Sequence, residues 1–427
     1  MTHLPVPHVG CVGLMLGRIV FRCRCHQRQI DEDLSQAGFQ DAFMAAFPND
    51  LDHKWRQTVR RRLLAWYRLN GRSLPWRKSA DSYCIWISEI MLQQTTIAAV
   101  TPYFERFCEQ FPTVQHLAGA QEADVLRQWE GLGYYSRARN LHKAARIIVD
   151  EYAGQLPDDV DSLLKLPGIG PYTARAVASL AYGRGVGILE ANTIRVYSRL
   201  IELDENPRSS SAGRMLWKFA DWIVAPRSSS SFNQAAMDVG STICTSEDPS
   251  CSQCPLQKQC CSYQAGRQHE LPRTPPKKQI TDVTEVALVL RRGSRILMRQ
   301  YSDGERWAGL WDFARFSVSV EQGDQLMLLP GPDAAGGATL FASESASFAA
   351  KAAREHTGLQ IFDPYLVTRI RHTVTRFRIR LICVMATRVR GSADRTTGLQ
   401  WQPETRLGEL PLSTTARAIA KLVSGLS

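Results

Sequence analysis

The sequence predicts a multi-domain protein in which an all-α domain is followed by a smaller α+β domain. Its 427 residues are too many for one ordinary domain. Apolar residues recur at helical spacing from Trp55 onward, and the pattern changes to that of strands after a proline-rich stretch at 264–282. We therefore expect four segments: an N-terminal extension (1–53), a helical domain (54–262), a linker (263–282) and an α+β domain (283–427). The N-terminal extension should be poorly ordered.

Composition narrows the class of protein. The net charge of +11 and a pI near 9.2 favour a polyanionic partner, although a solubilising surface would explain the charge equally well. No apolar run approaches the ~20 residues of a membrane span. Residues 9–16 are apolar but lack a preceding basic segment, so we expect neither a secretory signal nor a membrane partner.

The helical domain begins with an amphipathic pattern in which Val59, Leu63 and Trp66 share one face. Pro75 then ends this helix. Strand-like runs are missing from the sequence up to the linker, and we expect further helices at 86–104, 122–129, 137–152, 159–164, 172–182, 193–200 and 212–225.

The second domain opens with two apolar runs, 286–290 and 296–298, joined by a short basic and glycine-containing turn. This pattern predicts a β-hairpin. Further strands are expected at 377–385 and 398–401, and helices at 345–356 and 414–423.

A glycine hairpin, Leu-Pro-Gly-Ile-Gly-Pro-Tyr-Thr at 166–173, carries the first functional signal. Gly168 and Gly170 flank one apolar residue and lead into a helix, so that unpaired backbone N–H groups can face an anion. We interpret this anion as a DNA phosphate. Glu190 follows a later apolar run and could line one cleft together with Tyr172.

Four cysteines, Cys244, Cys251, Cys254 and Cys260, form the strongest metal-binding pattern. They lie within seventeen residues, which favours metal binding in a reducing compartment over disulfide bonds. Such spacing suits a cubane iron–sulfur cluster, and by itself it also leaves zinc open.

This cysteine spacing resembles that of the endonuclease III and MutY superfamily of helix-hairpin-helix DNA glycosylases, which implies a [4Fe-4S] cluster. Residues 86–95 resemble the helix that carries the catalytic acid of the MutY family, and 129–141 resemble the family's DNA wedge. Together with the glycine hairpin and the second domain, the resemblance covers roughly residues 55–425.

Glu89 is the expected catalytic acid. Its helical neighbours Ile85, Trp86, Ile90 and Leu92 are apolar and should raise its pKa, so that it can protonate a leaving group near neutral pH. The alternative is an exposed glutamate on an amphipathic helix.

The resemblance implies the remaining catalytic roles. Glu89 would protonate the leaving adenine, Glu190 would stabilise or attack the sugar carbon, and Asn192 would hold the carboxylates. Tyr172 stands where lyases of the endonuclease III type have the lysine that forms a Schiff base, which implies a monofunctional enzyme. The family usually has aspartate and glycine where this chain has Glu190 and Ala191, so we expect a working but slower site.

DNA contacts are also implied by the resemblance. Gln93, Gln94 and Tyr134 would enter the base stack when the target base is flipped out, with buried packing as the alternative role. Arg77, Arg137 and Arg139 would contact phosphate or base.

The second domain resembles a Nudix fold that has lost its catalytic box, since only Glu355 remains of the metal-binding glutamates. In the MutY family this domain recognises 8-oxoguanine through a Phe-Ser-His loop. That loop falls on Val374, Thr375 and Arg376, where Thr375 keeps only the hydroxyl.

Together these features predict a monofunctional adenine DNA glycosylase of base excision repair that acts on adenine opposite 8-oxoguanine or guanine. The alternatives are a thymine or uracil mismatch glycosylase and a lesion-binding protein without catalysis. We expect a monomer that binds double-stranded DNA with a mispaired adenine, in the bacterial cytoplasm and associated with the nucleoid.

Overall fold

The structure is a computed structural model that describes residues 51–424 except 80, 274, 276–278, 306 and 333–339. The chain divides into a first unit, Met1–Thr58, and a second unit, Val59–Ser427. Nearly all of the predicted N-terminal extension lies outside the described residues. In the described chain, no helix combines the length and the apolar character that crossing a membrane requires.

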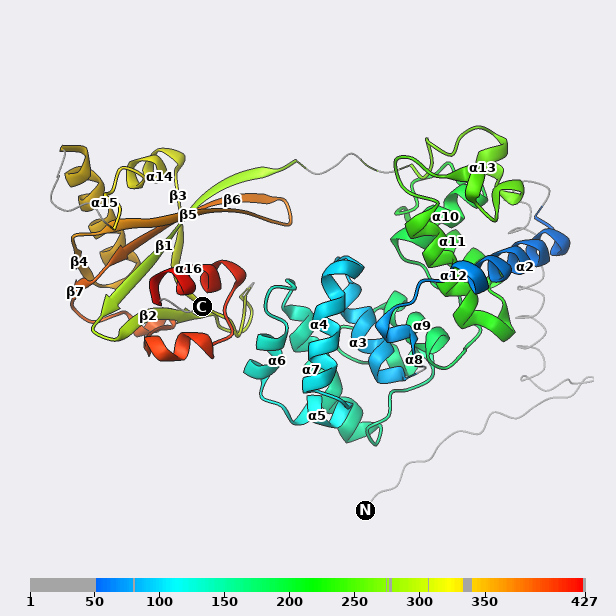
Figure 1. Ribbon diagram of the computed structural model, residues 1–427, viewed down its shortest axis with the longest axis horizontal. Helices are drawn as coiled ribbons and strands as arrows, with labels where there is room; N and C mark the ends of the chain where they lie inside the picture. The colour runs from blue at the N-terminus through cyan, green and yellow to red at the C-terminus, as the bar shows by residue number, and fades with distance from the viewer. Residues whose placement is uncertain are drawn as a thin grey trace, which may run out of the picture. The chain divides into compact units, whose positions relative to one another are not determined.

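Residues 53–264 form helices joined by loops, as predicted (Figure 1). The α-helices are α2 (His53–Asn70), α3 (Ser82–Leu92), α4 (Ile97–Gln110), α5 (Val114–Gly119), α6 (Glu122–Gln128), α7 (Ser136–Glu151), α8 (Val160–Leu164), α9 (Pro171–Leu180), α10 (Ala191–Leu200), α11 (Ser210–Ile223), α12 (Ser229–Thr242) and α13 (Cys261–Gln264). Short 3-10 turns are η1 (Pro75–Arg77), η2 (Pro226–Ser228), η3 (Cys251–Gln253) and η4 (Gln257–Gln259).

One helix prediction is corrected, and some helices, among them α12, were not predicted. The segment predicted as one helix at 86–104 is split into α3 and α4, because Asp81 caps the start of α3 and Thr96 caps a new helix start after Gln93 and Gln94. The helix α12 was not predicted, since its sequence is rich in serine and contains glycine, which are weak helix formers. Packing against α9 and α10 compensates for this weak propensity.

Helix α3 lies at the centre of the helical domain, in contact with α4, α7 and α9 (Figure 1). Trp86, Ile87, Ile90 and Met91 are almost completely buried. A helix that is apolar on all sides belongs in a core, so any polar residue on it is held in a low-dielectric environment.

The second domain is built on a six-stranded sheet with the order β5-β6-β1-β3-β2-β8. Strands β1 and β6 are parallel, and the other neighbouring strands are antiparallel. The strands are β1 (Thr281–Arg292), β2 (Arg295–Gln300), β3 (Trp311–Val318), β4 (Gln360–Phe362), β5 (Tyr365–Val374), β6 (Phe377–Ala386), β7 (Arg388–Arg390) and β8 (Leu399–Pro403), of which β4 and β7 form a separate pair.

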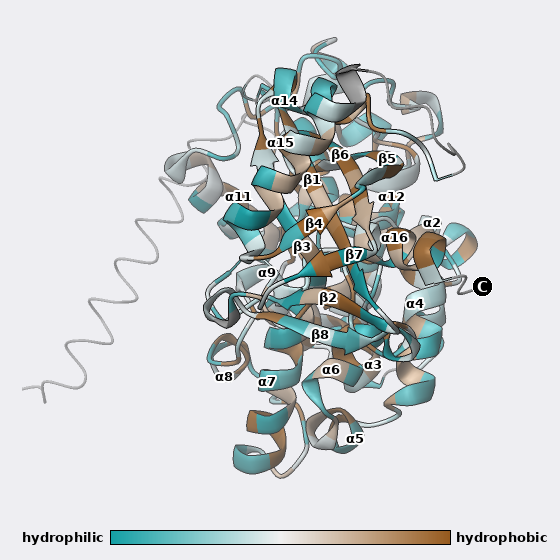
Figure 2. Ribbon diagram, turned by 90° about the vertical axis from the view of Figure 1, so that its left-hand side faces the viewer, coloured by the Kyte–Doolittle hydropathy of each residue, from teal (hydrophilic) through white to brown (hydrophobic). Residues whose placement is uncertain are grey.

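Helices cover both faces of this sheet. On one face Val286 and Leu288 of β1 pack with residues of α14 (Val320–Leu326) and α15 (Leu340–Thr357), and on the other Ala287 and Val289 pack with α16 (Thr414–Ser424). The apolar stretches of β1 and β6 are correspondingly brown in Figure 2. The predicted β1–β2 hairpin is confirmed, whereas β3 and β5 were not predicted.

Candidate active site

Helix α3 places Glu89 in the core, where its side chain is 2% exposed. The hydroxyl of Tyr172, at the start of α9, donates a hydrogen bond to Glu89 Oε2. Two residues separated by 83 positions in the sequence are thereby joined at one point.

Burial raises the pKa of Glu89 to about 7, as its apolar neighbours predicted. The hydrogen bond from Tyr172 and the positive charge of Arg77 lower this pKa, and the negative charge of Glu190 raises it. A carboxyl group with such a pKa is available as an acid near neutral pH.

Glu190 is the N-cap of α10, and its carboxylate is fixed by the first turn of that helix. The backbone N–H of Asn192 donates to Oε2 at 2.8 Å, and the N–H of Thr193 donates to Oε1 at 2.9 Å. The side-chain amide of Asn192 also donates to Oε2, at 3.0 Å. The extra methylene of glutamate therefore does not prevent a complete capping box. Burial raises the pKa of Glu190 in spite of these bonds.

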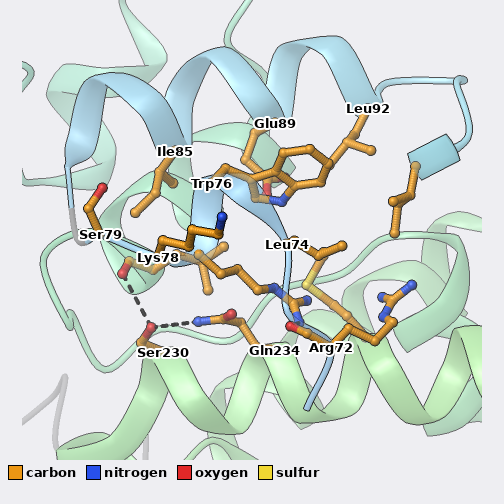
Figure 3. Close-up of a pocket in the computed structure, with 14 residues that line it drawn as sticks. Arg72, Leu74, Trp76, Lys78, Ser79, Ile85, Glu89, Leu92, Ser230 and Gln234 are labelled. Atoms are coloured by element: carbon orange, nitrogen blue, oxygen red, sulfur yellow. Dashed lines mark hydrogen bonds between the residues drawn. The ribbon is translucent and has the colours of Figure 1, made fainter. Parts of the chain in front are cut away.

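A cavity of about 230 Å³ opens beside Glu89. Figure 3 shows Ile85, Glu89 and Leu92 of α3 on one wall, and Ser230 and Gln234 of α12 on the opposite wall. Two hydrogen bonds, one to each end of the amide, orient the Gln234 side chain. Tyr67 Oη donates to its Oε1 at 2.9 Å, and its Nε2 donates to Ser230 Oγ at 3.0 Å.

Sequence reasoning missed the contribution of α12 to this cavity. Ser230, Gln234 and Asp238 recur every four residues and share one helix face. This four-residue spacing of polar side chains was the signal that could have identified them.

Arg77, one of the predicted DNA contacts, lines the cavity and is paired within the protein. Its Nη1 and Nη2 donate to the two carboxylate oxygens of Asp238 at 2.8 and 3.0 Å. Arg77 is therefore held in the cavity wall as part of an ion pair.

The predicted DNA-inserting residues gather around a second cavity. Gln93, Gln94, Tyr134 and Gly168 line it together with Arg137 and other residues of α3 and α7. Gln94 has a φ of 58° and Tyr134 a φ of 50°, a left-handed conformation that is unusual for residues other than glycine. Gln94 is exposed, and Tyr134 is 44% exposed.

Gln93 differs from Gln94, because its side-chain amide donates to Thr173 Oγ1 at 3.1 Å. This bond attaches the end of α3 to the start of α9.

The glycine hairpin joins α8 to α9. Gly168 has a φ of 78°, and a Cβ there would lie only 2.8 Å from Asn140 Cβ. Gly170 is the N-cap of α9, and no atom would lie within 4 Å of a Cβ at this position. The N-terminus of α9 thus presents its N–H groups without a capping side chain, as an anion site requires.

Arg137, predicted to contact phosphate or base, is engaged within the protein. Its side chain is buried, with the residue 8% exposed, and donates to the backbone oxygens of Ile90, Met91, Gln93, Leu132 and Gly133 and to Thr95 Oγ1. Arg137 instead ties the end of α3 to the loop that carries Tyr134.

The four predicted metal ligands lie in one loop after α12. Cys244, Cys251, Cys254 and Cys260 are half-buried thiols that influence one another electrostatically. Arg199 Nη1 donates to Cys244 Sγ at 3.2 Å. Within the described chain, no three His, Cys, Asp or Glu side chains converge as ligands of a single metal ion.

Thr375 lies in the second domain, at the tip of the β5–β6 hairpin. It is exposed, has a φ of 56°, and its hydroxyl donates to the backbone oxygen of Val374 at 2.7 Å.

Two family models match the chain. That of the HhH-GPD superfamily base excision DNA repair proteins matches residues 87–221, and that of the NUDIX domain matches residues 285–422. These matches confirm the predicted order of a helical glycosylase domain and a Nudix-like domain.

Curated relatives are named adenine DNA glycosylase. That of Rattus norvegicus is 41% identical over 245 residues, which cover 55% of this chain and 46% of the relative. That of Buchnera aphidicola subsp. Schizaphis graminum is 36% identical over 260 residues, which cover 61% of this chain and 75% of the relative. The chain thus spans about half the length of the rat protein and three quarters of the bacterial one.

Among solved structures, a thermostable thymine-DNA glycosylase aligns with 50% of this chain and 98% of its own, at 28% identity and a TM-score of 0.46.

Proposed function

Because the chain belongs to the adenine DNA glycosylase family, we propose that it is a monofunctional enzyme of base excision repair that hydrolyses the N-glycosidic bond of mispaired adenine. The observation that carries this proposal is the buried Glu89, bonded to Tyr172 and placed in the wall of a cavity. The mispairs are adenine opposite 8-oxoguanine or guanine.

The cavity receives the adenine after it has been flipped out of the duplex. Protonated Glu89 donates its proton to a ring nitrogen of the base, which weakens the bond to the sugar. As the bond breaks, positive charge develops on the sugar, and the Glu190 carboxylate stabilises this charge or attacks the sugar carbon. Asn192 holds Glu190 in place.

Tyr172 supports hydrolysis without strand cleavage. A phenol cannot form the Schiff base that a lyase makes with the sugar through a lysine amine. The Tyr172 hydroxyl instead donates to Glu89 and orients the acid.

Cys244, Cys251, Cys254 and Cys260 would hold a [4Fe-4S] cluster. Four cysteine thiols from a single loop match the ligand chemistry of such a cluster, and the Arg199 guanidinium would compensate its negative charge. The cluster would stabilise the loop that follows α12.

The partner is double-stranded DNA that contains a mispaired adenine, bound by a monomer in the cytoplasm of a bacterial cell. Gly168 and Gly170 contact phosphate. The gap left by the flipped base is occupied by Gln93, Gln94 and Tyr134, and Arg77 contacts the base from the cavity wall.

Thr375 contributes to recognition of 8-oxoguanine by the second domain. Since the aromatic and histidine positions of the family loop are Val374 and Arg376 here, rates opposite 8-oxoguanine and guanine should differ less than in relatives that keep that loop.

Single-turnover base release tests the proposal. Duplexes carry A, T or U opposite 8-oxoguanine or guanine, and Glu89→Gln is the control for the acid. Adenine release that depends on Glu89 is expected. Release of thymine or uracil would assign a mismatch glycosylase, and tight binding of the duplex without release of any base would assign a lesion-binding protein.

A further inference from the structure

Asp238 is a fully buried carboxylate that the proposed reaction does not use. Its exposure is 0%, and it is not among the residues that line the cavity beside Glu89. It lies on α12, one turn after Gln234, and stands behind two residues that do line the cavity, Arg72 and Arg77.

Five polar contacts converge on this carboxylate from the loop that precedes α3. Arg72 donates through its backbone N–H to Oδ2 at 3.0 Å and through Nε to Oδ1 at 2.7 Å, and its Nη2 lies 2.5 Å from Oδ1. Arg77 donates to both oxygens in a bidentate pair. Asp238 therefore determines where both guanidinium groups stand.

The charges of Asp238, Arg72 and Arg77 do not cancel. Burial alone would raise the pKa of Asp238, but the hydrogen bonds and charges of Arg77 and Arg72 hold it below its ordinary value, so Asp238 stays ionised. One negative charge thus faces two positive charges, and without it both positive charges would be uncompensated.

This charge balance matters for Glu89. The positive charge of Arg77 lowers the pKa of Glu89 and so disfavours its protonated form. The other groups that influence Glu89 are Tyr172 of α9 and Glu190 at the start of α10. Lys78 adds a further cation to the cavity wall, whereas Ile97 of α4 and Gln234 of α12 contribute uncharged side chains. Arg137, on α7, is bonded to backbone oxygens at the end of α3.

We propose that Asp238 is a positioning residue for the reaction. It holds Arg77 and Arg72 in the wall of the base cavity and compensates their charge, so that Glu89 remains an acid at neutral pH. The inference rests on the proposed function, in which protonated Glu89 is the reactive form.

Asp238→Asn tests this role, since it keeps the shape and removes the charge. Uncompensated Arg77 then favours ionised Glu89, and the alkaline limb of the single-turnover pH profile should move to lower pH by about one unit. Release of adenine would be about tenfold slower above the limb and close to that of the unmodified protein at pH 5.5.

Three further variants separate charge from folding. Asp238→Glu keeps the charge and should keep the limb near its original pH. Asp238→Asn combined with Arg77→Gln should return the alkaline limb to its original pH. Arg77→Gln alone should move it to higher pH, which tests the same balance even if Asp238→Asn does not fold.

A direct titration of Glu89 makes the result independent of catalysis. In cluster-loaded protein without DNA, the carbonyl stretch of the protonated carboxyl is followed by infrared difference spectroscopy, with Glu89→Gln to assign the band. If the unmodified protein releases no base, the proposed function fails, while the band still reports whether Asp238 governs the protonation of Glu89. A uniform fall in rate at every pH, with an unmoved limb and an unmoved band, would show that Asp238 is only a structural anchor and would overturn the proposal.

Discussion

The burial of Glu89 should make the protein less stable at the pH where the acid ionises, and Glu89→Gln should remove this cost. The ordinary pKa of 4.5 applies in the unfolded chain, whereas burial raises it to about 7 in the folded protein. Between these values the folded state binds more protons than the unfolded state, so the free energy of unfolding falls as pH rises.

The magnitude follows from the two pKa values. A difference of about 2.5 pH units at roughly 1.4 kcal/mol per unit corresponds to about 3 kcal/mol. The contribution of Glu89 to the free energy of unfolding is fully present below pH 4.5 and is lost by pH 7 to 8. The uncharged amide of Glu89→Gln does not titrate, so this variant should gain up to about 3 kcal/mol relative to the unmodified protein at pH 8 and little at pH 4.5.

Urea unfolding followed by tryptophan fluorescence at pH 4.5, 6, 7 and 8 measures the difference. Glu355→Gln, which changes an exposed glutamate of α15, is the matched control and should show the pH dependence of the unmodified protein. Equal pH dependence in Glu89→Gln and the control would refute the reasoning, because it would mean that Glu89 has the same proton affinity in both states.

The other predictions concern Tyr172, Glu190, Arg137 and the cysteine loop. Tyr172→Phe removes a hydrogen bond that lowers the pKa of Glu89, so the alkaline limb of the pH–rate profile should move to higher pH; an unmoved limb would contradict this contact. Glu190→Gln should slow adenine release by about 10²–10³-fold in single-turnover assays and reduce stability by about 1 kcal/mol in thermal melts, since an amide nitrogen cannot accept from the N–H groups of α10. Arg137→Lys should destabilise the protein by at least about 2 kcal/mol in urea unfolding, because three ammonium donors cannot serve six acceptors; a smaller loss would mean that water replaces the missing donors. Cys254→Ser should lower the iron and sulfide content of the purified protein, and unchanged content would remove Cys254 from the ligand set.

Local signals predicted much of the fold. Helical periodicity, caps and the glycine hairpin act between residues a few positions apart, so α7, α9 and α10 were placed within a few residues of their observed ends. The strands β3 and β5 were not predicted because β3 carries Asp312 and Arg315 in its interior and β5 is an edge strand with two arginines. Their structure depends on pairing with distant strands.

By itself, the sequence determined that Glu89 lies among apolar neighbours, that two glycines precede α9 and that four cysteines share one loop, since each of these is a relation between nearby residues. Only the tertiary structure decided which groups act on Glu89. The Tyr172 hydroxyl reaches it across 83 residues, and Asp238 reaches Arg77 across 161. The physical reason is that the proton affinity of a buried acid depends on every charge and dipole nearby in space, and the packing of α3 against α9 and the loop anchored on α12 bring those groups together.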